Sequence, residues 1–186
     1  MRLSVAADVS AKAGIAKLQQ DVLSTIWGPD EVRPVERQNF CFVLFFIGEQ
    51  DNTATGRIKS KLGELRFDPI RLTFTGIRAF PDPNSARSVW VGVDKEGASR
   101  LANLAGKVAS RMKEIGLEPD RPFIPHLTIF HTKGGPLEMG RSFAKYRGRD
   151  FGSDLIDRIR LKKSNPAGSG SVYSDIFTVN SQRRPA

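Results

Sequence analysis

The chain has 186 residues, a net charge of +9 and a pI of about 10.1, with 39% hydrophobic and 26% charged residues. This length suits one domain or two small lobes with a shared core, and no apolar run approaches the ~20 residues of a membrane-spanning helix. The N-terminus lacks the basic and apolar regions of a signal peptide. The single cysteine, Cys41, excludes an internal disulfide and a cysteine-rich zinc site. We therefore expect a cytoplasmic protein that does not contact a membrane.

The positive charge is concentrated in the C-terminal third of the chain. Residues 133–186 carry 11 Lys/Arg against 5 Asp/Glu, whereas residues 1–132 carry 18 against 15. An excess of this kind favours a polyanionic partner, with RNA or DNA first. The alternative is that the charge only keeps the protein in solution, and net charge alone does not decide between the two.

Hydrophobic patterning predicts strands that alternate with helices. The predicted strands cover residues 2–8, 39–49, 70–80, 88–94, 123–132, 155–163 and 172–179. The predicted helices run from Ser10 to about Gly28, over 53–65 and over 95–116, where Gly116 can end the last helix. The residues 164–171, which are rich in Ser and Gly, should join the last two strands as a hairpin.

This order predicts an α+β protein with helices outside mainly antiparallel sheets. One half of the chain loosely repeats the other as strand, helix and strand. No segment is long enough to be a linker between independent domains, so residues 1–186 should form a single domain.

Both histidines of the chain lie in one predicted strand, in the stretch PFIPHLTIFHTKGG at residues 122–135. Side chains alternate between the two faces of a strand, so His126 and Thr128 should share a face. An imidazole beside a hydroxyl can bind a phosphate and exchange a proton with it near neutral pH. His131 is five residues beyond His126 and should point away, unless a bulge intervenes. The alternative is that His126 is an ordinary surface or hydrogen-bonded histidine.

The chain as a whole resembles the 2H phosphoesterases of the LigT-like group, the 2′-5′ RNA ligase and RNA 2′,3′-cyclic phosphodiesterase family. The resemblance covers five stretches in the family's order, namely residues 1–10, 35–49, 76–94, 121–131 and 159–176. It implies two pseudo-symmetric lobes with sheets that line a central cleft. It also implies a His-x-Thr/Ser motif from each lobe, acid–base chemistry on a cyclic phosphodiester, no metal or other cofactor, and RNA with a 2′,3′-cyclic phosphate or a 2′-5′ linkage as the partner. We further expect a monomer.

One of the two motifs departs from the family pattern. The second motif is intact as His126 and Thr128, but the first falls on Cys41 and Val43. Val43 cannot donate a hydrogen bond, and a free thiol titrates near pH ~8.5. Cys41 could therefore be a poor acid or base, a nucleophile if its pKa were lowered, or a small buried hydrophobic residue. Asn39 is the next polar residue expected on the same face.

Other basic residues are candidates for contacts with RNA. His131 occupies a place where the family often has a basic residue, and it or Lys133 could contact phosphate, unless both are solvated. Arg158, Arg160 and Lys162 should share one strand face, which suits a phosphate backbone. Residues 140–150 interleave two aromatic residues with four cations, which favours either base stacking or a segment that buries its aromatic rings.

Three hypotheses follow. The first is an RNA 2′,3′-cyclic phosphodiesterase-like enzyme that opens cyclic phosphate ends of RNA, or joins or cleaves 2′-5′ linkages. In it His126 is the acid or base, Thr128 holds the phosphate, and Cys41, Asn39 or a water molecule replaces the missing histidine, so that catalysis is altered or impaired. The second is a non-catalytic protein of the same fold that binds RNA ends. The third is a hydrolase in which Cys41 attacks and His126 assists.

Overall fold

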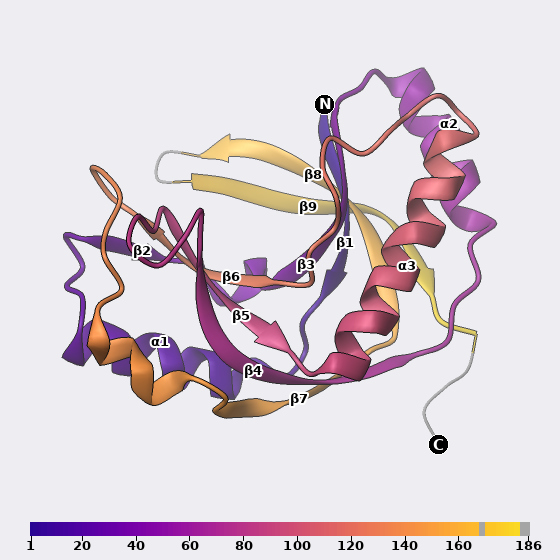
Figure 1. Ribbon diagram of the computed structural model, residues 1–186. Coiled ribbons are helices and arrows are strands. Elements are labelled where there is room, and N and C mark those ends of the chain that lie inside the picture. The colour runs from indigo at the N-terminus through magenta and orange to yellow at the C-terminus, as the bar shows by residue number, and fades with distance from the viewer. Residues whose placement is uncertain (168–169, 183–186) are drawn as a thin grey trace.

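The computed structural model describes residues 1–167 and 170–182, which form two antiparallel sheets with three helices (Figure 1). Sheet A has the strand order β3-β1-β8-β9 and sheet B the order β2-β6-β5-β4-β7. Sheet A contains β1 (Arg2–Asp8), β3 (Cys41–Glu49), β8 (Arg158–Ala167) and β9 (Gly170–Asn180). Sheet B contains β2 (Val32–Pro34), β4 (Ile70–Phe80), β5 (Ser88–Val93), β6 (Leu127–Thr132) and β7 (Asp150–Ile156). The predicted α+β class is confirmed.

The three predicted helices are present as α1 (Ala13–Thr25), α2 (Asn52–Gly63) and α3 (Lys95–Lys113). Helices α2 and α3 contact each other at one end of the molecule, whereas α1 lies at the other end against sheet B (Figure 1). The carboxylates of Asp51 and Asp94 cap the first turns of α2 and α3 by accepting backbone N–H groups. Two 3₁₀ helices complete the order, η1 (Arg37–Asn39) and η2 (Arg141–Tyr146).

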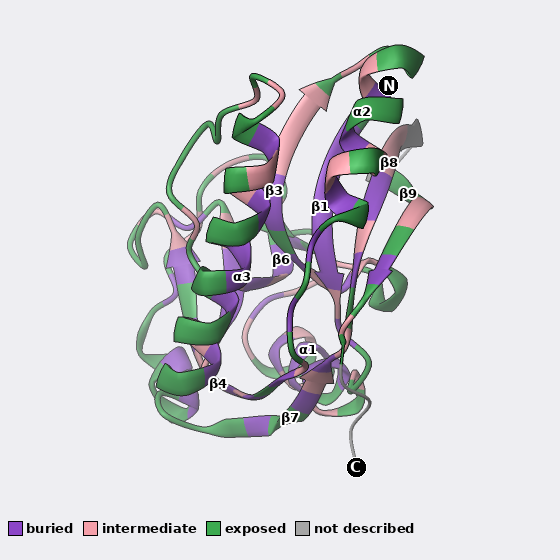
Figure 2. Cartoon of the chain, turned by 90° about the vertical axis from the view of Figure 1, so that its right-hand side faces the viewer, coloured by how far each residue is buried: buried purple, intermediate pink, exposed green. Residues whose placement is uncertain are grey.

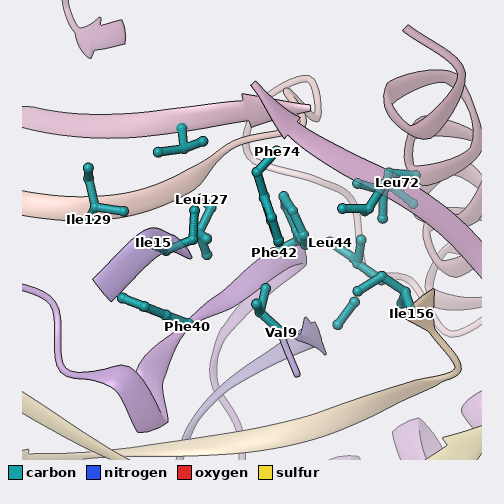
Figure 3. Packing of buried hydrophobic residues seen from close by; sticks show 14 of the residues in the cluster. Val9, Ile15, Phe40, Phe42, Leu44, Leu72, Phe74, Leu127, Ile129 and Ile156 are labelled. Atoms are coloured by element: carbon teal, nitrogen blue, oxygen red, sulfur yellow. The ribbon is translucent and has the colours of Figure 1, made fainter. Parts of the chain in front are cut away.

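A single hydrophobic cluster joins the two sheets. Phe40, Phe42 and Leu44 from the β3 region belong to this cluster together with Leu127 and Ile129 of β6 (Figure 3). The ring of Phe42 also stacks on that of Phe74 in β4, with 6.2 Å between centroids. Burial of apolar surface therefore holds sheet A against sheet B, and the most deeply buried segments lie in the middle of the molecule (Figure 2).

Three predicted strand boundaries were wrong. The predicted strand 123–132 begins only at Leu127, so that His126 lies just before it. The predicted strand 155–163 is divided, because the chain leaves β7 in sheet B at Ile156 and enters β8 in sheet A at Arg158. The predicted strand at 39–49 begins only at Cys41, since Asn39 belongs to η1. Gly168 and Ser169 of the predicted hairpin connection lie outside the described residues.

Candidate functional site

The predicted pair lies at the start of β6, on the side of sheet B that faces away from the core. Thr128 pairs with Trp90 of β5, and Trp90 pairs with Arg78 of β4. Directly paired residues project to the same side of a sheet, so these three side chains form a row across three strands. Their neighbours Leu127 and Ile129 are fully buried on the opposite side. His126 immediately precedes β6 and packs against the same row.

The imidazole of His126 is held by its backbone and by two aromatic rings. Its Nδ1 lies 2.6 Å from the carbonyl oxygen of Ile124, and since a carbonyl only accepts, Nδ1 carries the proton. The ring packs edge-on against Phe80 and Trp90, with centroids 5.1 and 5.7 Å away. Burial lowers the pKa of His126 below its usual value of 6.5, and the charge of Arg121 adds to this effect. The ring is therefore neutral at pH 7, with its lone pair at Nε2.

His131 does not point away from the row, because a bulge intervenes. Val89 pairs with Phe130 while the next residue, Trp90, pairs with Thr128, so β6 contains one extra residue. Ile129 and Phe130 are both fully buried, as two successive residues of a bulge can be. His131 therefore returns to the face of Thr128.

Hydrogen bonds fix this bulge in place. Gln19 of α1 donates through Nε2 to the carbonyl of Ile129, over 2.8 Å, and the backbone N–H of Val35 donates to the same carbonyl. Burial, together with the charge of Arg33, lowers the pKa of His131 below 6.5. Lys133, the other candidate beyond Thr128, donates through Nζ to the carbonyl of Pro29 over 2.7 Å.

Cys41 and Val43 lie on the corresponding side of sheet A. They pair with Asp8 and Ala6 of β1, and they alternate with Phe42, which faces the core. Val43 is 42% exposed, unusually so for a valine, on a face where the resemblance expects a hydroxyl. Burial raises the pKa of the Cys41 thiol to about 12. Cys41 is therefore a neutral thiol at pH 7, which opposes a role as a nucleophile.

Strands β3 and β6 contact each other where the two sheets meet. Phe40 and Phe42 of the β3 region lie near Leu127 of β6 within the shared core (Figure 3). Because side chains alternate along a strand, Cys41 and Val43 on β3 and Thr128 on β6 all project away from this core. The structure thus brings together the two chain segments that the resemblance expects to carry the motifs.

Arg158, Arg160 and Lys162 share one face of β8, as predicted, but carboxylates neutralise them. Lys162 Nζ lies 2.8 Å from carboxylate oxygens of both Asp8 and Asp175. Arg160 pairs with the same two carboxylates, and Arg158 pairs with its neighbour Asp157. Burial acts to lower the pKa of Lys162, but the hydrogen bonds to Asp175 and Asp8 outweigh it and raise that pKa. The predicted basic stripe is therefore present on this face of β8, and each of its cations is paired with a carboxylate.

A hollow of about 650 Å³ opens on this face of sheet A. The predicted residues Asn39, Arg158 and Arg160 line it together with Lys162 and Tyr173. His131 and Lys133 are not among its lining residues: His131 belongs to β6 of sheet B, and Lys133 lies just beyond the end of that strand. The predicted substrate-binding residues are therefore divided between the two sheets.

The aromatic residues within 140–150 are buried, so they offer no stacking surface to RNA. Phe143 and Tyr146 of η2 are 4% and 1% exposed. Phe143 packs on Trp27 with 4.7 Å between centroids, and the Tyr146 hydroxyl donates to Asp21. Of the two interpretations of this segment, burial of its aromatic rings is confirmed.

Sequence reasoning missed Asp8, Arg78 and Trp90. Asp8 ends a strand that is otherwise apolar after Ser4. A carboxylate in such a place needs a cationic partner, and this was the sequence feature that could have indicated its role. The strand pairings that bring Arg78 and Trp90 beside Thr128 join segments distant in the chain, and local pattern does not reveal them.

Comparison with known proteins places the chain in a family. The family model of the 2′-5′ RNA ligase superfamily matches residues 41–146. An RNA 2′,3′-cyclic phosphodiesterase of Archaeoglobus fulgidus is 35% identical over 95% of this chain and 98% of its own length. A protein of the same description from Aquifex aeolicus is 32% identical over 75% of this chain and 77% of its own length.

Solved structures agree on the fold. Escherichia coli LigT in complex with 3′-AMP superimposes with a TM-score of 0.75 over 98% of both chains, at 22% identity. The TT0787 protein of Thermus thermophilus gives a TM-score of 0.77 over 98% of this chain and all of that chain, at 19% identity. The chain therefore belongs to the 2′-5′ RNA ligase superfamily, and its two antiparallel sheets have the LigT-like 2H phosphoesterase fold.

Proposed function

We propose that this protein opens 2′,3′-cyclic phosphate ends of RNA, with His126 as the only histidine that moves a proton in the reaction. The observation that carries the proposal is the state of His126: a neutral imidazole, oriented by Ile124, beside Thr128 on a face away from the core. Relatives described as RNA 2′,3′-cyclic phosphodiesterases support the choice of substrate.

The proposed reaction follows from the tautomer of His126. The Nδ1–H group donates a hydrogen bond to the carbonyl of Ile124 and keeps its proton, which leaves Nε2 free to act as the base. Nε2 accepts a proton from a water molecule as that water attacks phosphorus. The bond from phosphorus to one ribose oxygen breaks, and that oxygen takes a proton from solvent. The Thr128 hydroxyl donates to a non-bridging oxygen and stabilises the charge that develops there.

The second acid–base group is absent in this proposal. The Cys41 thiol, with its pKa of about 12, stays neutral, and the Asn39 amide does not titrate. Water therefore replaces the missing histidine, and Val43 leaves one phosphate oxygen without a hydroxyl donor. Loss of one general acid or base commonly lowers the rate by ~10²–10⁴-fold, so we expect slow turnover.

We also propose that residues 1–186 act as one domain and as a cytoplasmic monomer, with each sheet as one lobe. The single hydrophobic cluster shared by both sheets supports this arrangement. No helix among the described residues is long and apolar enough to cross a membrane.

The test uses a short RNA with a 2′,3′-cyclic phosphate end and follows conversion of that end to a monoester in the presence of a chelator. His126→Ala should slow conversion ~10²–10⁴-fold, because it removes the base. Cys41→Ala should change the rate less than about threefold, and Arg57→Ala, at an exposed position of α2, is the control and should turn over like wild type. Absence of turnover by the wild type, or equal rates for wild type and His126→Ala, would contradict the proposal.

A second candidate is a non-catalytic protein that binds RNA ends, and the replacement of the first motif by Cys41 and Val43 favours it. This candidate predicts binding that weakens with salt and no conversion of the cyclic end. A hydrolase with Cys41 as nucleophile would require a thiolate near neutral pH, which the raised pKa of Cys41 opposes.

A further inference from the structure

A second cavity, of about 760 Å³, lies on sheet B near the reaction centre proposed above. The end of β4, the loop at residues 81–84 and the segment 138–148 form its walls, and Trp90 of β5 contributes to its lining. A volume of this size is in the range of sites that bind small molecules, and it can accept a nucleoside.

Trp90 connects this cavity to His126 and Thr128. Its backbone pairs with Thr128, and its ring packs against the ring of His126 with 5.7 Å between centroids. The ring of Phe80 contacts both side chains, with its centroid 5.1 Å from that of Trp90 and 5.1 Å from that of His126. One indole ring therefore lies between the cavity and the proposed site of phosphate chemistry.

The indole N–H of Trp90 needs a hydrogen-bond acceptor. Trp90 is only 7% exposed, and its Nε1 has no hydrogen-bond partner among the described residues. An indole nitrogen is only a donor, and a buried donor without an acceptor is rare in folded proteins. A ligand that carries an acceptor, such as the carbonyl oxygen or ring nitrogen of a nucleobase, would satisfy it.

The arginines of this cavity also lack carboxylate partners. Arg78, Arg141 and Arg147 line it and are exposed, and in the part of the chain that the structure describes no carboxylate lies within 4.0 Å of their guanidinium groups. The contrast with β8 is clear, since Arg158, Arg160 and Lys162 all pair with Asp residues there. Asp82 and Glu138 also line the cavity, so three cations face two carboxylates, and the net charge there is still positive.

We propose that this cavity binds the RNA that precedes the cyclic phosphate end. A base enters the cavity and accepts a hydrogen bond from Trp90 Nε1, while backbone phosphates contact Arg141 and Arg147, with Arg78 beside the indole ring, 5.7 Å from its centroid. This inference rests on the proposed function for its choice of RNA end. It makes the protein selective for an oligonucleotide over a 2′,3′-cyclic mononucleotide, which would leave the cavity empty.

The test measures binding, so that it does not depend on turnover. A fluorescently labelled RNA hexamer with a 3′-phosphate is titrated with wild type, with Arg141→Ala/Arg147→Ala and with Arg57→Ala, which removes one charge from α2, outside the cavity lining. The double variant should bind at least about tenfold more weakly and should lower the salt slope by about 1.4, because ~0.7 counterion is released per phosphate contact on single strands. Arg57→Ala should bind like wild type.

A second variant tests the base contact. Trp90→Phe keeps an aromatic ring but loses the donor, and it should bind the hexamer about five- to tenfold more weakly. Binding of the hexamer by the double variant and Trp90→Phe as tightly as by wild type, or no binding by wild type, would overturn the inference. Hydrolysis of a cyclic mononucleotide by the wild type is measured in parallel. If the wild type hydrolyses it while these variants bind RNA normally, the proposed function stands and only the RNA-binding role of the cavity is refuted.

Discussion

Cys41 shows how its surroundings set the chemistry available to one side chain. Its thiol lies beside Asp8 and near Lys162, yet burial dominates and raises its pKa to about 12. The thiol of a free cysteine titrates near pH ~8.5, so the folded protein holds roughly a thousandfold less thiolate at pH 8.

Alkylation of Cys41 therefore distinguishes a buried thiol from an activated one. At pH 8 we expect iodoacetamide to modify native Cys41 about a thousandfold more slowly than the same cysteine in denaturant, because only the thiolate reacts. Mass spectrometry of the intact protein over time gives both rates. Modification of the native protein faster than of the denatured chain would show an activated thiolate and revive the third hypothesis.

The sequence predicted that His126 and Thr128 share a face, because alternation along a strand is local. It left the face of His131 dependent on a bulge, because the bulge at Ile129 is held by hydrogen bonds from Gln19 and Val35, which lie far away in the chain. A single extra residue reverses every later side chain of a strand, so short-range patterns cannot fix faces beyond it.

At the scale of elements, β8 is held between β1 and β9 by a network of four charges. Lys162 is 6% exposed and shares Asp8 and Asp175 with Arg160. Burial acts to raise the pKa of Asp175, but Lys162 and Arg160 outweigh it and lower that pKa. The stability from this lowered pKa is present above the ordinary pKa of aspartate and is lost as the pH falls through the folded value.

Lys162→Ala should destabilise the protein by about 3 kcal/mol, because it leaves two carboxylates with one cation in a largely buried place. Urea unfolding measures the change. Arg158→Ala on the same face is the matched control: its side chain is 45% exposed, and its loss should cost less than about 1 kcal/mol. Equal effects of the two substitutions would show that the network adds nothing beyond a surface ion pair.

Most helices and strands could be predicted from periodicity, but the partners of charged residues could not. The alternation in β8 correctly put Arg158, Arg160 and Lys162 on one face. Their carboxylate partners come from β1 and β9, and these pairings exist only after the sheet has formed. The division of the predicted strand at Asp157 was missed for a similar reason, because the chain can pass from one sheet to the other while its side chains keep an alternating pattern.

At the scale of the whole molecule, the two sheets depend on one core. Phe42 of sheet A stacks on Phe74 of sheet B, and both are fully buried. Most strands and helices along the chain could be predicted from the sequence, apart from β2 and most of β7. The seam between β3 and β6 could not, because local patterns do not show which distant segments meet.

Phe42→Ala should therefore weaken both sheets together, by about 3–5 kcal/mol. Far-UV circular dichroism reports on all strands, while tryptophan fluorescence reports on Trp90 in sheet B and on Trp27 beside η2. We expect both signals to shift to the same lower urea concentration. A fluorescence midpoint that stays at the wild-type value would show that the sheets unfold independently.

The most direct test of the central claim, that a single histidine works here, is the pH dependence of kcat/KM for opening a 2′,3′-cyclic phosphate on RNA. A base must be deprotonated, so kcat/KM should rise with pH through the pKa of His126, which lies below 6.5, and then stay level to about pH 9. A bell-shaped profile with a descending limb between about pH 6 and 8 would reveal a second titrating acid and contradict the account.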